Sequence, residues 1–146
     1  MRYLVMVQGS QADYDAMSGR ASARGPAWSE EDLQAMFAFM GKIGEDLAAS
    51  GELIDANGLA EPAQTLWVSS GPDGVPVITD DPYDETTLLP AGYWVLDCAT
   101  PERVTEIAAR ITRCPGPEGL TGPPVVIRPI LDSGAEAAGG GRRGTG

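Results

Sequence analysis

The 146-residue sequence contains no histidine. This absence excludes Ser-His-Asp and Cys-His catalysis, zinc sites with histidine ligands and pH switching by an imidazole. Any acid–base chemistry must therefore use carboxylates, tyrosines, arginines or the only lysine, Lys42.

Positive charge is also scarce, since 10 Lys and Arg stand against 21 Asp and Glu and give a formal net charge of −11. Proteins that bind nucleic acid need a basic face to displace counterions from phosphates, and anionic membranes select for the same feature. Two of the arginines, Arg142 and Arg143, lie in a Gly-rich C-terminal segment. We therefore expect neither a nucleic acid nor a membrane surface as a partner.

Long apolar runs are missing, because none approaches the roughly 18–20 residues that span a bilayer. The apolar stretch at residues 2–8 is too short for a signal peptide, so we expect a cytoplasmic protein. Of the two cysteines, Cys98 and Cys114, neither is expected in a disulfide. The predicted helix between them separates them by roughly 20 Å, whereas a disulfide needs Cα atoms within about 7 Å.

The length and the hydrophobic content of 42% suit one folded domain, which we place at residues 1–131. Gly, Ala and Ser dominate residues 132–146, so we expect a disordered tail there.

Strand patterns come from apolar runs and from turn residues. The strands are expected at residues 2–8, 64–69, 75–79, 92–98 and 125–131. The turn sequence Gly71-Pro72-Asp73-Gly74 makes the second and third of these a hairpin. Pro129 indicates that the last strand lies partly at an edge.

Two helices are expected. The first begins at Ser29 with a capping box and ends at Gly51. Its apolar stripe consists of Leu33, Met36, Phe37, Met40, Ile43 and Leu47. The second begins at Thr100-Pro101. Its buried side consists of Val104, Ile107, Ala108 and Ile111. Residues 9–28 show no strong periodicity and are expected to be an irregular loop.

This order predicts an α+β fold, namely a ferredoxin-like sandwich with an antiparallel sheet and two helices on one face. The strand at 92–98 is apolar on both sides. The face without helices must therefore also be covered, and a symmetric homodimer that packs sheet on sheet would cover it.

An acidic segment follows the predicted hairpin. It contains Asp80, Asp81, Tyr83, Asp84 and Glu85. Repulsion among four carboxylates raises a pKa when the site is partly buried, which supplies an acid or base without histidine. The same oxygens suit Mg²⁺ or Ca²⁺, although the spacing is not that of an EF-hand loop. The structural alternative is a solvated turn in which Asp80 caps its own backbone. We expect no metal or cofactor.

Three further residues are candidates for ligand contacts. Tyr93 and Trp94 point to opposite faces of their strand, so one of them faces either the space under the helices or the dimer interface. Arg128 lies mid-strand and is expected either to pair with Asp80 or Asp97 or to bind a substrate carboxylate.

Part of the predicted loop also suggests a lid. The side chains that could form it are Tyr14, Arg20, Arg24 and Trp28. The alternative is that this loop is merely mobile.

Two stretches carry a resemblance to a known family. The sequences TDDPYDET at residues 79–86 and AGYWVLD at residues 91–97 resemble the signature of the YCII-related family in its DGPF-domain branch, T-D-G-P-F-x-E-T followed by G-G-Y-Y-x-x-D. Asp81, Tyr83 and Trp94 depart from that signature. The resemblance covers roughly residues 1–131. Its other matches are residues 2–6, 51–54, 58–60 and 126–130.

The resemblance implies the fold of dimeric α+β barrels and a choice between two functions. Some members are suspected enzymes with a histidine–aspartate pair, and at least one relative eliminates chloride from a hydroquinone ring. Others are similar to accessory proteins encoded beside ECF sigma factors. Because this chain has no histidine, the pair does not carry over.

We therefore expect one of two functions. The first is a lyase, isomerase or cyclase with its pocket between the sheet and the helices. Its acid–base groups would be Asp80, Glu85 and Tyr93, and its substrate contacts Asp81, Tyr83, Trp94 and Arg128. The second is a non-catalytic ligand-binding or accessory protein. Convergence of Asp80, Glu85 and Tyr93 on one cavity would favour the enzyme.

Overall fold

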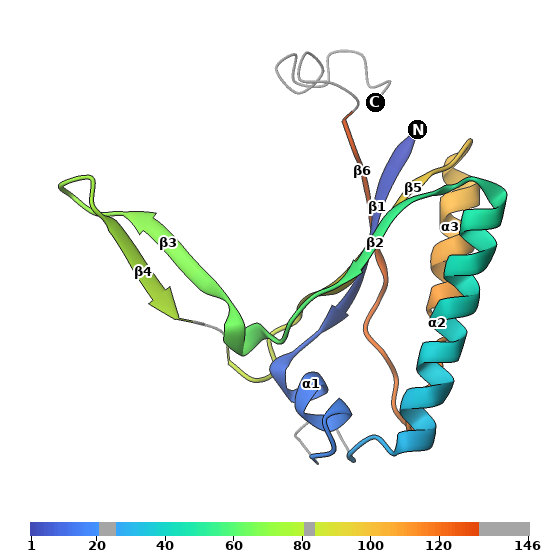
Figure 1. The fold of residues 1–146 in the computed structure, drawn as a ribbon, viewed down its shortest axis with the longest axis horizontal. Helices are drawn as coiled ribbons and strands as arrows, with labels where there is room; N and C mark the ends of the chain where they lie inside the picture. The colour runs from blue at the N-terminus through green and yellow to red at the C-terminus, as the bar shows by residue number, and fades with distance from the viewer. Residues whose placement is uncertain (21–25, 81–83, 132–146) are drawn as a thin grey trace.

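Figure 1 shows the fold of the chain in a computed structural model, which describes residues 1–20, 26–80 and 84–131. The elements are β1 (Arg2–Gly9), α1 (Gln11–Met17), α2 (Glu30–Ser50), β2 (Leu53–Gly58), the 3-10 turn η1 (Pro62–Gln64), β3 (Leu66–Ser70), β4 (Pro76–Asp80), β5 (Leu89–Asp97), α3 (Pro101–Ile111) and β6 (Val126–Pro129). The predicted tail at 132–146 falls outside the described ranges.

The main sheet has four antiparallel strands in the order β2-β5-β1-β6. It is an open sheet, with β2 at one edge and β6 at the other. The strands β3 and β4 form a separate two-stranded sheet. Together with three α-helices this is an α+β fold, as the order of sequence patterns predicted.

The helices α2 and α3 lie on the same side of the main sheet (Figure 1). The core between them consists of Tyr3, Val5, Ile43, Leu47, Leu96, Cys98, Val104, Ile107, Ala108 and Ile111. The predicted stripe of α2 is wrong at Phe37, which is 63% exposed. Phe37 lies about 120° around the helix from Ile43, so it misses the sheet, and Phe39 packs against the core instead.

One ion pair joins the end of α2 to the start of α3. The Arg103 guanidinium donates from Nε to Glu52 Oε2 and from Nη2 to Glu52 Oε1, at 2.8 Å each. These charge-assisted hydrogen bonds lower the pKa of Glu52 from 4.5 to about 2. Glu52 directly follows Gly51, whose φ of 80° ends α2 in the left-handed conformation that glycine favours.

The helix α1 occupies part of the segment predicted to be irregular. Its start is a capping box, in which the Ser10 hydroxyl accepts from Asp13 N at 3.1 Å and Asp13 Oδ2 accepts from Ser10 N at 2.8 Å. Ala12 and Ala16 are buried. The prediction was wrong here because a seven-residue helix with two small buried residues has almost no apolar periodicity.

The strand β2 was not predicted, and it takes the place in the main sheet that the predicted hairpin strands would have filled. Its sequence, LIDANG, is poor in residues that favour strands, and its side chains beyond Leu53 are exposed. It is a strand because it pairs along β5. The predicted hairpin does form, but β3–β4 projects on the side of the sheet opposite the helices (Figure 1).

Both cysteines are free thiols, as predicted, and burial raises the pKa of each. Within the described ranges, no helix combines the length and the apolar character needed to cross a membrane.

Candidate functional site

The face of the main sheet that the helices leave open carries the most polar arrangement on the sheet. Paired residues of antiparallel strands point to the same face, so the register identifies its members. They include Leu4, Met6, Asp55, Asn57, Tyr93, Val95, Val126 and Arg128. Apolar side chains of β1 and β5 occupy the middle, and polar ones lie towards both edges. We call this surface the open face.

Tyr93 is held in place on the open face by two residues of the edge strand β2. Asn57 Nδ2 donates to Tyr93 Oη at 2.9 Å, and Tyr93 Oη donates to Asp55 Oδ2 at 3.3 Å. Asn57 Nδ2 also lies 3.3 Å from Asp55 Oδ2. We call these three residues the Tyr93 cluster. It presents a phenol, a carboxylate and an amide at one edge of the sheet, which suits hydrogen bonding to a polar ligand.

Arg128 lies on the opposite edge strand, β6, where it pairs in register with Leu4. Its predicted partner Asp97 instead binds the N-terminal amine at 3.3 Å, so the Asp97 pairing is wrong. None of the ion pairs found among the described residues includes Arg128. The strand β1 separates β6 from β5, which places the strands of Arg128 and Tyr93 roughly 10 Å apart, and the two residues are offset by two further positions along the register.

The acidic segment is divided among different elements. Asp80 is the last residue of β4 in the hairpin, and Asp81 and Tyr83 are outside the part of the chain that the structure describes. Glu85 has an exposed side chain, and its carbonyl accepts a 2.8 Å hydrogen bond from Ala12 N in α1. Neither Asp80 nor Glu85 belongs to the sheet that carries Tyr93.

Asp84 shapes the turn that follows the hairpin. Its Oδ1 accepts from Thr86 N at 2.9 Å, from Thr86 Oγ1 at 2.9 Å and from Thr87 Oγ1 at 3.0 Å. These bonds lower the pKa of Asp84. Asp84 thus caps the backbone of this turn through its side chain, and the capping expected of Asp80 lies outside what the structure describes of that side chain. Among the residues that the structure describes, no group of acidic or cysteine side chains is placed to hold a metal ion.

Trp94 points to the helix side of the sheet, opposite Tyr93, as the alternation along the strand predicted. A Cβ at Gly44 of α2 would lie 3.7 Å from the Trp94 ring, so the indole packs on this glycine and against the core. The space between the sheet and the helices, where sequence reasoning placed a pocket, is filled at this point by apolar side chains.

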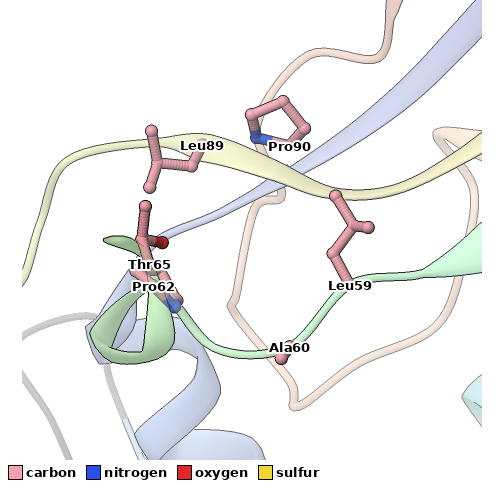
Figure 2. Close-up of a pocket in the computed structure, with 6 residues that line it drawn as sticks. All are labelled: Leu59, Ala60, Pro62, Thr65, Leu89 and Pro90. Carbon is pink, nitrogen blue, oxygen red and sulfur yellow. The ribbon is translucent and has the colours of Figure 1, made fainter. Parts of the chain in front are cut away.

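A small pocket opens at the base of the hairpin. It has a volume of about 240 Å³ and is lined by Leu59, Ala60, Pro62, Thr65, Leu89 and Pro90 (Figure 2). This volume is below the range of about 300–1,000 Å³ that is usual for ligand sites. None of the predicted site residues lines it. The pocket lies between the loop after β2 and the start of β5.

Tyr14 of α1 fixes the chain beside this pocket. Its hydroxyl donates to the Leu59 carbonyl at 2.8 Å and lies 3.3 Å from the Ala91 carbonyl. Burial, together with the nearby Glu61 carboxylate, raises the pKa of Tyr14. The phenol therefore stays protonated. It links α1 to the loop after β2 and to β5, which is a structural role for a residue expected in a lid.

Sequence reasoning missed Asp55 and Asn57. Their strand is polar and short, so no periodicity identified it. The spacing Asp-x-Asn, which puts both side chains on one face of a strand, was the available signal. No known protein-family model matches the chain, and a search of curated proteins gives no significant match.

Proposed function

We propose that this protein binds a small molecule at the Tyr93 cluster on the open face. The observation that carries the proposal is the Tyr93 hydroxyl, which is oriented by Asn57 at 2.9 Å and by Asp55 at 3.3 Å. A hydroxyl with fixed hydrogen-bond partners discriminates between ligands better than a freely rotating one, because less conformational entropy is lost on binding.

The ligand class follows from the charge and shape of the cluster. Asp55 accepts hydrogen bonds and repels anions, and the chain as a whole carries a net charge of −11. Met6 lies beside Tyr93 in register and offers an apolar, polarisable surface. A neutral aromatic molecule with hydroxyl groups combines both requirements. Arg128, at the other edge, is available to an acidic group of a longer ligand or of a partner.

Several features support a ferredoxin-like dimer of the YCII-related type as the framework of this site. The strand order β2-β5-β1-β6 and the two helices on one face are those of a ferredoxin-like sandwich. The apolar middle of the open face, with Leu4, Met6 and Val95, suits packing on a second copy. The sequence signature at 79–97 supports the family, and the free thiols suit the cytoplasm.

A second candidate function is a lyase, isomerase or cyclase. The observation in its favour is that Tyr93 donates to the Asp55 carboxylate, which pairs a phenol with a base. Asp80 ends β4 and Glu85 lies in the turn after the hairpin, so neither belongs to the strands that carry the Tyr93 cluster. The cluster, with one carboxylate and one amide beside the phenol, supports binding more directly than catalysis. A sigma-factor accessory role rests on the sequence resemblance alone.

Ligand-observed NMR with resorcinol, a neutral diphenol, tests the proposal against benzoate, an aromatic anion of similar size. We expect saturation transfer to resorcinol and not to benzoate. Tyr93→Phe removes the hydroxyl, and Asp55→Asn replaces the charged acceptor of Tyr93 with a weaker neutral amide, so we expect resorcinol to bind roughly tenfold more weakly to each variant. New product resonances in the same spectra would favour the enzyme.

Asp73→Asn is the matched control, because it removes the same charge at the tip of the hairpin, far along the chain from the cluster. It should leave resorcinol binding unchanged. If Asp73→Asn and Asp55→Asn weaken binding equally, the effect is one of net charge and the proposed site is wrong. Absence of resorcinol binding to the unaltered protein would overturn the ligand class.

A further inference from the structure

The β3–β4 hairpin exposes large apolar side chains on both of its faces. Val68 and Ile78 are paired in register, and with Leu66 they share one face at 66%, 62% and 63% exposure. Trp67 and Val77 belong to the other face, at 48% and 45% exposure. A hairpin with one face exposed to solvent would alternate apolar and polar residues along each strand. This one has the composition of a strand pair that is covered on both sides.

Among the residues that the structure describes, no other element covers the face formed by Leu66, Val68 and Ile78. The strands β3 and β4 contact chiefly each other, and the hairpin leaves the body on the side opposite the helices (Figure 1). Two strands alone are marginally stable in water. Apolar patches larger than a few hundred Å² usually mark an interaction surface on a protein. The exposed apolar side chains therefore give the hairpin the character of an interaction surface.

The placement of charge on the hairpin favours an apolar partner surface, and a second copy of this chain offers one. From Leu66 to Asp80 the hairpin carries two acidic residues, Asp73 and Asp80, and no basic one. Asp73 lies in the turn and Asp80 ends β4, so the paired residues between them carry no charge. A second copy presents uncharged apolar surface of the same kind, and burying two such surfaces on each other leaves no charge unpaired.

Geometry selects the same partner. The hairpin projects on the side of the sheet where the open face lies (Figure 1). A second copy seated on the open face would come within reach of the hairpin. In a two-fold dimer the same contact forms twice, so both hairpins and the apolar middle of both open faces are covered by one association.

We propose that the β3–β4 hairpin is an arm that packs against a second copy of this chain. The arm rests on the homodimer included in the proposed function, and it adds a contact separate from the open face. Each arm covers its exposed aliphatic face, formed by Leu66, Val68 and Ile78, on the partner. The interface thereby gains two apolar contacts beyond the sheets.

Sedimentation equilibrium of the full chain and of the double variant Val68→Ser/Ile78→Ser tests the arm. We expect the unaltered protein to have the mass of two chains at micromolar concentration. The variant should raise the dissociation constant of the dimer by about 100-fold or more, because four large apolar contacts are lost per dimer. The control is Phe37→Ser, which changes a side chain of similar exposure, 63%, on the helix α2. It should leave the dissociation constant unchanged.

One further variant separates this proposal from the others. Met6→Lys places a charge in the middle of the open face and should also weaken the dimer. If Met6→Lys gives monomers but Val68→Ser/Ile78→Ser leaves the dissociation constant unchanged, the sheet dimer stands and the arm is overturned. A protein that is monomeric at about 100 μM overturns both, whereas resorcinol binding is measured independently. Far-UV circular dichroism verifies that each variant is folded, since the substituted hairpin residues are exposed.

Discussion

Both sides of the main sheet carry large aliphatic residues, but these residues differ in how far they are buried. On the helix side, Ile43 and Leu96 are fully buried within one chain. On the other side, the hairpin residue Ile78 is 62% exposed and Val68 is 66% exposed. The helix side therefore buries its apolar residues within one chain, whereas the open side exposes apolar surface that we propose to be an interface.

This difference shows what an apolar pattern means in a sequence. Both isoleucines stand in regular elements that were predicted from the same kind of pattern. The pattern identifies a side chain that avoids water, but it does not say whether the cover comes from the same chain or from another. Only the packing distinguishes a core residue from an interface residue.

The largest expected effect is the difference in unfolding free energy between alanine substitutions at Ile43 and at Ile78. Ile43→Ala removes a fully buried side chain from the core and should lower the free energy of unfolding by about 2–5 kcal/mol. Ile78→Ala truncates an exposed side chain and should change it by no more than about 0.5 kcal/mol in the monomer. Urea denaturation at a concentration where the chain is monomeric measures both values.

Repeating the measurement where the dimer forms sharpens this comparison. The cost of Ile78→Ala should then grow with protein concentration, whereas the cost of Ile43→Ala should not. Equal costs for the two alanine variants in the monomer would contradict this difference in burial between the two sides.

The sequence predicted the elements that carry strong local signals. The helix α2 was found because Ser29 caps it and Gly51 ends it, and α3 because Thr100 and Pro101 begin it. The helix α1 and the strand β2 were missed because their formation depends on their surroundings. A buried Ser10 supports α1, and pairing with β5 makes β2 a strand. Tertiary context decided both.

The second prediction concerns the ion pair that closes the helix side. Glu52→Gln removes a carboxylate that accepts two 2.8 Å bonds from Arg103. Its pKa of about 2, against 4.5 in the absence of these bonds, corresponds to several kcal/mol without screening. Because Arg103 is 41% exposed, we expect a loss of only about 1–2 kcal/mol at pH 7. Urea denaturation of both proteins measures it.

The pH dependence has a definite sign. A lowered pKa means that the contribution of Glu52 is fully present above pH 4.5 and is lost as the pH falls towards 2. The stability difference between the unaltered protein and Glu52→Gln should therefore shrink over this range. Glu106→Gln is the control, since Glu106 is 69% exposed and contacts the same arginine at 3.3 Å. If the stability difference between the unaltered protein and Glu52→Gln did not change with pH, the ion pair with Arg103 would not be its cause.

The candidate site was predicted only in part. Tyr93 was chosen correctly as facing away from Trp94, but its partners Asp55 and Asn57 come from the strand that the sequence did not reveal. The acidic segment attracted attention by its density of charge. Charge density in a sequence does not determine which carboxylates approach one another, and the fold places Asp80 and Glu85 on separate elements.

The smallest expected effect distinguishes two neighbouring acids in the turn between β4 and β5. Asp84→Ala removes an acceptor of three hydrogen bonds from Thr86 and Thr87, so the Thr86 amide should exchange with solvent faster. Glu85→Ala should leave this exchange unchanged, because Glu85 contributes its backbone carbonyl, which alanine retains. Hydrogen exchange followed by NMR measures both. The pKa of Asp84 is lowered, so its carboxylate stays charged until the pH is acidic. The protection of the Thr86 amide in the unaltered protein should therefore be lost only as acid protonates this carboxylate. If Glu85→Ala has the larger effect, the side chain of Glu85 has a role that this turn does not explain, and its place among the candidate acids would regain support.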